Sequence, residues 1–312
     1  MKKTQSIEWE RPILDYRSPL TYELMMEYIN VFSERYKNIA VAYIGESILG
    51  RAIPAVTLGD PSTDSGVLYV GAHHGMEWIT SVLLLRFINE FCENLETSKQ
   101  MYGLNMSYLV RTRHITVIPM LNPDGVNIQI TGVPDDCPMG DRLLRMNGSK
   151  NFKKWQANAR GVDLNHNYAA GFAEYKVIEA EAGIDGGCAT KFSGEYPESE
   201  PETGALANLL RYDGKTKALL TLHTQGEEIY CGSGGAETLR IGRIISQMCG
   251  YELCRPEGTA AYGGLSDWYT AEFARPAFTL ECGRGQNPLP LADYFKIYAG
   301  LREVLYTFPA MI

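Results

Sequence analysis

The stretch Val67-Leu-Tyr-Val-Gly-Ala-His-His-Gly-Met-Glu77 places a histidine and a carboxylate three residues apart, directly after an apolar run. The apolar run predicts a buried strand that delivers His74. The turn that opens the following helix, near Met76, should deliver Glu77 to the same spot. His73 is the competing histidine, and the three-residue spacing to the carboxylate favours His74. The pair therefore predicts half of a metal site.

A second apolar run supplies the missing histidine. Lys217-Ala-Leu-Leu-Thr-Leu-His223 reads as another buried strand, and it ends in a histidine shortly before Gly226. Open α/β sheets build their sites at the carboxyl ends of strands. Two histidines and one carboxylate leave the fourth position of a tetrahedral Zn²⁺ open, as in hydrolytic rather than structural sites. We therefore expect one zinc ion per chain, held by His74, Glu77 and His223, in a metallohydrolase. His114 opens a strand and is expected to be a hydrogen-bonded core or strand-end residue.

The bulk composition limits the possible partners. The chain has 312 residues, of which 45% are hydrophobic and 21% charged, and a net charge of −8. Nucleic acid is not expected as a partner, because such binding rests on neutralising phosphates with Lys and Arg. The longest apolar run, inside 79–85, is far shorter than the roughly 20 residues that span a bilayer. We see no secretion signal at the amino terminus, and the seven cysteines show no C-x-x-C spacing. A cytoplasmic protein is expected, and the oligomeric state is not indicated.

The order of elements predicts an α/β fold. Strand-like and helix-like patterns alternate, which indicates a single domain with a mixed, mostly buried central sheet flanked by helices. We expect an N-terminal extension over 1–18 and a catalytic domain over 19–312. Two caps are predicted, Ser18 for the first helix and Ser199, in a capping box with Glu202, for a later one. Asn122-Pro-Asp-Gly125 reads as a turn that opens a long irregular loop, 126–158. The helices are expected over 22–36, 76–95, 199–212, 236–249, 265–273 and 291–308, and the strands over 39–44, 52–58, 67–71, 115–121, 217–223 and 277–282.

Taken together, the motifs resemble the zinc carboxypeptidase family of metallopeptidases. The motifs that occur in the family's order are His74-x-x-Glu77, Asn122-Pro-Asp-Gly125, Gly161-Val-Asp-Leu-Asn-His-Asn167, His223 and Phe278-Thr-Leu-Glu281. Within that family, four strings look most like the bacterial γ-D-glutamyl-L-diamino acid endopeptidases, which act on peptidoglycan stem peptides. They are Trp155-Gln-Ala-Asn158, Ser199-Glu-Pro-Glu-Thr203, His223-Thr-Gln-Gly-Glu-Glu-Ile-Tyr230 and Glu281-x-Gly-x-Gly-x-Asn-Pro-Leu-Pro290. The resemblance implies the carboxypeptidase fold.

The resemblance also implies roles for single residues. Glu281 ends an apolar strand and matches the family's general base, which aims the zinc-bound water and returns its proton to the leaving amine. The alternative is a structural glutamate paired with Arg275 or Arg284. Asp163 matches the aspartate that accepts a hydrogen bond from the first zinc histidine. Asn165 matches a residue that binds substrate.

Three positions depart from the family pattern. His166 stands where carboxypeptidases have the arginine that grips the C-terminal carboxylate of the substrate, so simple exopeptidase activity is not expected. Gln156 stands where many relatives have an arginine for the oxyanion, and the sequence leaves Lys153, Lys154 and Arg160 open as alternatives. Tyr262 is a shifted match for the family's loop tyrosine, and an ordinary loop tyrosine is the alternative.

We therefore expect a zinc peptidase that cuts the γ-D-glutamyl bond to a diamino acid in peptides or peptidoglycan fragments. Three alternatives stay open from the sequence: a zinc carboxypeptidase of other specificity, a zinc deacylase of the aspartoacylase type, and a zinc-binding protein that has lost turnover. The presence of Glu281 counts against the last, because a pure binder needs no base.

Overall fold

The computed structural model describes residues 14, 17–97, 100–232 and 234–312. The N-terminal extension expected over 1–18 lies largely outside these residues, and its boundary stays a prediction. Of that segment, Leu14 is buried against the main hydrophobic core.

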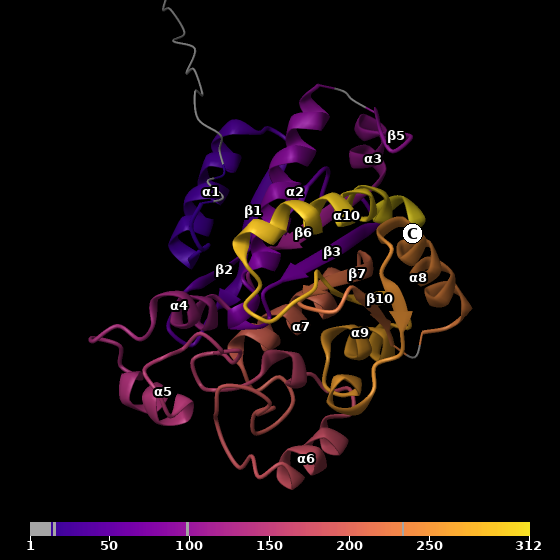
Figure 1. The fold of residues 1–312 in the computed structure, drawn as a ribbon. Coiled ribbons are helices and arrows are strands. Elements are labelled where there is room, and N and C mark those ends of the chain that lie inside the picture. The colour runs from indigo at the N-terminus through magenta and orange to yellow at the C-terminus, as the bar shows by residue number, and fades with distance from the viewer. Residues whose placement is uncertain (1–13, 15–16, 98–99, 233) are drawn as a thin grey trace, which may run out of the picture.

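Eight strands of the described chain form one mixed sheet (Figure 1). The central strands β6, β3, β7 and β10 run parallel, the pairs β1–β2, β2–β6 and β10–β8 are antiparallel, and the edge strand β9 pairs in parallel with β8. In sheet order the strands are β1 (Ile39–Glu46), β2 (Ala52–Leu58), β6 (His114–Ile118), β3 (Gly66–Gly71), β7 (Thr216–His223), β10 (Ala277–Glu281), β8 (Glu228–Cys231) and β9 (Glu252–Cys254). A separate small hairpin consists of β4 (Gln100–Met101) and β5 (Leu104–Asn105).

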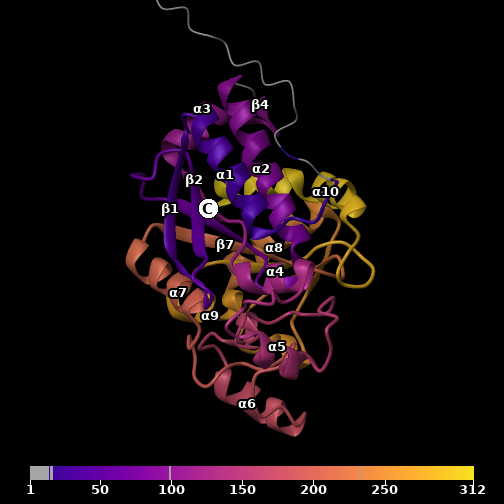
Figure 2. The ribbon, with the colours of Figure 1, turned by 90° about the vertical axis from the view of Figure 1, so that its left-hand side faces the viewer.

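Helices cover both faces of this sheet (Figures 1 and 2). The α-helices are α1 (Tyr22–Arg35), α2 (Ile79–Glu96), α3 (Met106–Thr112), α4 (Pro123–Thr131), α5 (Gly140–Asn147), α6 (Phe172–Glu181), α7 (Pro201–Asp213), α8 (Ala236–Cys249), α9 (Leu265–Phe273) and α10 (Tyr294–Thr307). The short 3₁₀ turns are η1 (Gly75–Glu77), η2 (Leu164–His166), η3 (Gly258–Ala261), η4 (Leu291–Asp293) and η5 (Phe308–Met311).

The strand β3 shows how the two layers are built. Successive side chains of a strand point to opposite faces. Val67 and Tyr69 join the core under α1, α2, α8 and α10, whereas Leu68 and Val70 join the core under α7 and α9. All six residues of β3 are buried. A strand covered on both faces is apolar throughout, which is why this run could be predicted.

Most of the predicted elements are present, but both predicted helix caps are wrong. Thr21, rather than Ser18, caps α1 through a hydrogen bond from the amide of Leu24. Helix α7 begins after Glu200, and Ser199 donates instead to the carboxylate of Glu200. Pro201 takes the first position of the helix, where its missing amide hydrogen costs nothing.

The predicted turn at Asn122-Pro-Asp-Gly125 is also wrong, because this string is the first turn of α4. Asn122 is the N-cap, and its Oδ1 accepts from the amide of Gly125. The composition of such a cap is the same as that of a turn. The segment 126–158, expected to be irregular, contains most of α4 and all of α5.

Two further expectations can be compared with the fold. All seven cysteines are free thiols, in agreement with the predicted absence of a disulfide framework. A search of the described residues finds no helix with the length and hydropathy of a membrane span.

Candidate metal centre

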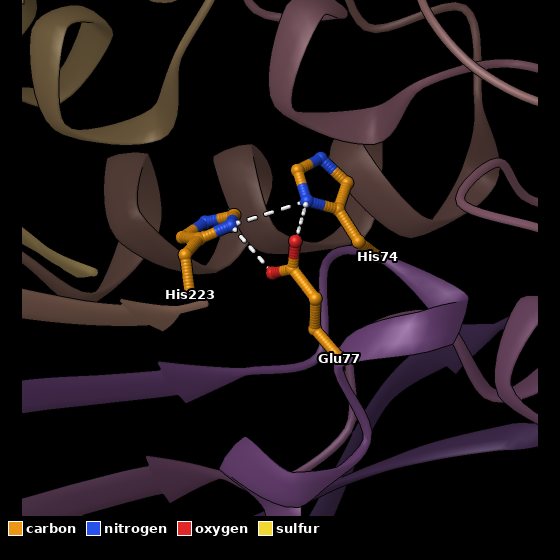
Figure 3. Close-up of side chains that lie close together, drawn as sticks. All are labelled: His74, Glu77 and His223. Atoms are coloured by element: carbon orange, nitrogen blue, oxygen red, sulfur yellow. Dashed lines mark hydrogen bonds and ion pairs between the residues drawn. The ribbon is translucent and has the colours of Figure 1, made fainter. Parts of the chain in front are cut away.

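The three predicted metal ligands come together at the carboxyl ends of two neighbouring strands (Figure 3). His74 follows β3, Glu77 ends the turn η1, and His223 is the last residue of β7. Strands β3 and β7 pair in parallel, with Gly71 opposite Leu222, so their ends lie at the same edge of the sheet. All three side chains are buried. The structure thus assembles the predicted cluster, and within the described residues it is the group suited to a metal ion.

The spacing of the donor atoms fits zinc. Nδ1 of His74 lies 3.0 Å from Oε1 of Glu77, Nδ1 of His223 lies 3.2 Å from Oε2 of Glu77, and the two Nδ1 atoms are 3.3 Å apart. Ligands about 2.0–2.1 Å from a tetrahedral Zn²⁺ are separated by roughly 3.3 Å. Two imidazole nitrogens that face each other this closely repel unless a proton or a metal ion lies between them. The donor set therefore fits a zinc ion.

Asp163 sets the orientation of His74. Its Oδ1 accepts from Nε2 of His74 at 2.9 Å and from the amide of Asn165 at 3.2 Å. The hydrogen on Nε2 leaves the lone pair of Nδ1 directed at Glu77 and His223. Burial would raise the pKa of Asp163, but the contact with His74 lowers it far below its usual value. Burial alone would lower the pKa of His74, yet Glu77 and Asp163 raise it well above the usual value. A proton and a metal ion therefore compete for Nδ1.

Two residues that the sequence did not single out hold the carboxylate of Glu77. The amide of Thr224 donates to Oε2 at 3.2 Å, and Nδ2 of Asn287 approaches Oε1 at 3.4 Å. Asn287 is itself fixed, because it donates to the carbonyl of Thr224 at 2.8 Å and accepts from the hydroxyl of Thr224 at 2.7 Å. Asn287 lies in a string quoted for its resemblance to the endopeptidases, but no local pattern indicated this contact.

Gln156 is brought against the turn that carries the metal ligands. Its carbonyl accepts from the amide of Gly75 at 2.9 Å. A side chain on Gly75 would collide with the carbonyl of Gly125, so this close approach requires glycine. The side-chain Oε1 of Gln156 accepts from the hydroxyl of Thr190 at 2.5 Å. This contact fixes the amide, and its Nε2 has no partner among the described residues. The side chain of Gln156 therefore offers a neutral donor, on a residue whose backbone contacts the turn that carries Glu77.

Glu281 lies beside His223. The parallel ladder of β10 and β7 pairs Glu281 with His223, and the antiparallel ladder of β10 and β8 pairs it with Glu228. Burial and the charge of Glu77 raise the pKa of Glu281. The structural alternative for this residue is wrong, because Arg275 donates to the carbonyl of Thr216 and Arg284 to the carboxylate of Glu227.

The other residues predicted to bind substrate have contacts of their own. Oδ1 of Asn165 accepts from the amide of Leu265, and Nδ1 of His166 bonds to the carbonyl of Tyr262. The ring of Tyr262 packs against Gly171. Arg160, one alternative for the oxyanion, extends toward Glu200, with 3.7 Å between Nη1 and Oε2. The structure records no contact of Lys153 or Lys154 with the metal ligands.

The other two histidines have structural partners. His73 lies between the hydroxyls of Tyr168 and Thr221 and stacks on the ring of His223. His114 bonds to the hydroxyl of Thr63, in agreement with its expected place in the core. The choice of His74 over His73 agrees with this geometry.

Comparison with known proteins places the arrangement in a family. The family model for zinc carboxypeptidases matches residues 25–240. The γ-D-glutamyl-L-diamino acid endopeptidase 1 of Lysinibacillus sphaericus is 32% identical over 298 residues, which cover 94% of this chain and 72% of that relative. The chain belongs to the zinc carboxypeptidase family.

Two further similarities agree with this family. The uncharacterized protein YqgT of Bacillus subtilis (strain 168) is 32% identical over 269 residues, which cover 84% of this chain and 70% of that relative. The crystal structure of thrombin activatable fibrinolysis inhibitor superimposes with a TM-score of 0.72 at 20% identity, covering 95% of this chain and 77% of that chain. At this identity the likeness concerns the fold alone, and it confirms the predicted α/β architecture. As a member of this family, the protein is a zinc-dependent hydrolase, and the predicted cofactor, Zn²⁺, is confirmed.

Proposed function

We propose that the protein hydrolyses the γ-D-glutamyl bond to a diamino acid in peptidoglycan stem peptides. The observation that carries the proposal is the register of β7 and β10, which sets Glu281 beside His223 at the edge where His74 and Glu77 also lie. A carboxylate with a raised pKa next to a three-ligand zinc site suits a hydrolase. The substrate class is supported by the relative from Lysinibacillus sphaericus, whose name states this activity.

Each residue of the site has its own role in the proposed reaction. His74, Glu77 and His223 would hold the zinc ion, which would supply the activation of a water molecule by lowering the pKa of that water toward about 7. Glu281 takes the proton of the attacking water and returns it to the leaving amine. Nε2 of Gln156 donates to the oxygen of the scissile carbonyl, where negative charge develops. Each role depends on a side chain that the fold holds in place through backbone pairing or a hydrogen bond.

Recycling of wall peptides in the cytoplasm is the cellular role that we attach to this activity. The seven free cysteines fit a reducing compartment. The match to the zinc carboxypeptidase model counts against a deacylase of the aspartoacylase type. A binding protein without turnover is disfavoured by Glu281, which serves no structural ion pair with Arg275 or Arg284.

Cleavage products test the proposal directly. The zinc-loaded protein is incubated with L-Ala-γ-D-Glu-meso-diaminopimelate and, separately, with ordinary peptides that end in Phe or Lys. Mass spectrometry then locates the cut. We expect release of L-Ala-D-Glu from the first substrate, with a higher kcat/KM than for either ordinary peptide. Faster release of the C-terminal Phe or Lys would contradict the proposed specificity and leave the zinc chemistry intact.

A further inference from the structure

The imidazole of His166 is held in one orientation. Its Nδ1 lies 2.8 Å from the carbonyl oxygen of Tyr262. One ring face stacks on Tyr175, with centroids 3.9 Å apart and an interplanar angle of 13°. Tyr175 is fixed in turn, because its hydroxyl donates to the carbonyl of Lys191 at 3.0 Å. Turning the ring over about its bond to Cβ would keep the stack but break the hydrogen bond between Nδ1 and Tyr262, so this hydrogen bond fixes which way the ring faces.

This orientation decides which nitrogen carries the hydrogen. A carbonyl oxygen only accepts, so Nδ1 must be the N–H of the pair. Burial lowers the pKa of His166, although Asp163 and the carbonyl of Tyr262 act in the opposite direction. The ring is accordingly neutral near pH 7, and a neutral imidazole has one donor and one acceptor. Nε2 is then an acceptor, and it has no partner among the described residues.

Two carboxylates, Asp163 and Glu179, act on His166 through their charge. The charges of Asp163 and His74 both act on His166, which lies three residues beyond the aspartate that holds His74. The point that a Cβ of Gly264 would occupy is 3.3 Å from Oδ2 of Asp267 and 3.8 Å from Nδ2 of Asn165. The carboxylate of Asp267 and the amide of Asn165 therefore both lie against Gly264. Arg160, one of the cations that the sequence left open for the oxyanion, extends toward Glu200.

We propose that Nε2 of His166 accepts a hydrogen bond from an N–H group in the leaving half of the substrate. A free carboxylate has only acceptors, so it gains nothing from Nε2 and is repelled by it. Two N–H groups have the right chemistry, namely the side-chain ammonium of the diamino acid and the amide of a residue that follows it. The inference rests on the proposed function and extends it to the group that selects the substrate.

Three matched substrates show which of the two N–H groups donates to Nε2. The parent is L-Ala-γ-D-Glu-L-Lys-D-Ala. Replacing Lys by norleucine removes only the ammonium, and replacing D-Ala by D-lactate turns the following amide into an ester without N–H. With wild-type protein we expect kcat/KM to fall about tenfold for one of the two altered substrates, as for the loss of one hydrogen bond. The altered substrate whose kcat/KM falls is the one that lacks the donor.

Two variants connect this preference to Nε2. In His166→Asn the shorter amide can still donate to the carbonyl of Tyr262, but nothing replaces Nε2. In His166→Gln an amide oxygen can take the place of Nε2. We expect the preference for the parent to disappear in the first variant and to be partly restored in the second, a coupling that a double-mutant cycle measures. A preference that persists in His166→Asn would overturn the proposal, and so would equal cleavage of all three substrates by wild type.

The tautomer gives a readout that does not depend on turnover. In ¹⁵N-labelled zinc-loaded protein, correlations between ring protons and ring nitrogens distinguish a protonated nitrogen from a bare one. A bare Nε2 is expected, and a protonated Nε2 at pH 7 would overturn the inference whatever the activity. Failure of wild type to cut any of the three substrates would contradict the proposed function instead, so the two failures can be told apart.

Discussion

Glu281 and His223 are neighbours on adjacent strands, but their environments act on them differently. Burial lowers the pKa of His223 and keeps its ring neutral, which a metal ligand requires. For Glu281, burial and the negative charge of Glu77 both raise the pKa. A carboxylate whose pKa is raised holds a proton more strongly, and a general base is most effective when its pKa is near the working pH. A zinc ion beside it would oppose the effect of Glu77.

Replacing Glu281 by Gln should abolish most turnover without loss of the metal. The amide preserves the shape of the side chain but cannot take a proton from water, and the loss of a general base typically costs at least about 10²-fold in kcat. Steady-state kinetics and the zinc content of the purified variant provide the measurement. Glu228→Gln is the matched control, because Glu228 lies directly opposite Glu281 in the β8–β10 ladder, and its loss should be well under tenfold. A Glu281→Gln enzyme within a few-fold of wild type would exclude this residue as the base.

Three buried carboxylates connect several elements on the side of α4 and α7. Asp124, in the first turn of α4, accepts from the amide of Leu49 and from the guanidinium of Arg51. Glu202, in the first turn of α7, accepts from Nδ2 of Asn158, and Glu200 accepts from the same nitrogen. Asp124 therefore has a cation at 2.7 Å, whereas no ion pair to Glu202 is recorded in the described structure.

Glu202 should make the stability of the protein depend on pH. Burial raises its pKa from 4.5 to about 8. The folded chain therefore keeps a proton that the unfolded chain has lost, and the stabilisation present below pH 4.5 disappears as the pH rises toward 8. We expect a loss of at least about 1.4 kcal/mol, the equivalent of one pKa unit, between pH 5 and pH 8. Urea unfolding at the two pH values measures it.

The control for this prediction is a carboxylate on the surface. Glu202→Gln cannot ionise, so its free energy of unfolding should change less between pH 5 and pH 8 than that of wild type. Glu34→Gln, on the exposed side of α1, should keep the wild-type dependence. The same pH dependence in all three proteins would show that the proton is bound elsewhere.

The sequence predicted those site residues that a local pattern marks, and it did not predict those whose contacts join distant parts of the chain. The sequence shows an apolar run, typical of a buried strand, before His74 and Glu77 and another before His223. Since the ends of such strands lie at one edge of the sheet, the three ligands could be expected to lie close together. Asn287 could not be assigned, because its contacts with Glu77 and Thr224 join parts of the chain 210 and 63 residues away. The caps of α1 and α7 were misplaced for another reason. Both candidate serines stand near a proline, and the pattern does not tell which residue first adopts the helical conformation.

At the scale of the whole molecule, the metal ligands join two central strands from distant parts of the chain. An ion that binds the folded state but not the unfolded one stabilises the fold by about 2.7 kcal/mol at a hundred times its dissociation constant. Removing zinc should therefore lower the free energy of unfolding and the Tm, and adding zinc back should restore both. Differential scanning calorimetry of the metal-free and reloaded protein measures the change.

His223→Ala is the control for this prediction. It removes one ligand from the end of β7, so it should bind far less than one zinc per chain, and its Tm should respond little to added zinc. His114→Gln should behave like wild type toward zinc, because His114 bonds to Thr63 outside the metal site. Stoichiometric zinc and full hydrolysis in His223→Ala would refute the assignment of this ligand.

The separation of His74 and His223 by 149 residues also concerns how the protein is made. Contacts between such distant segments form late, because a long loop must close first. A nascent chain whose residues 216–223 are still inside the ribosome presents only the histidine and carboxylate of the first half-site. Firm capture of zinc must then wait until the second histidine has emerged and β7 has aligned with β3. Metal uptake would mark the moment at which the centre of the sheet is complete, and an enzyme that digests peptides would remain inactive until its own folding is finished.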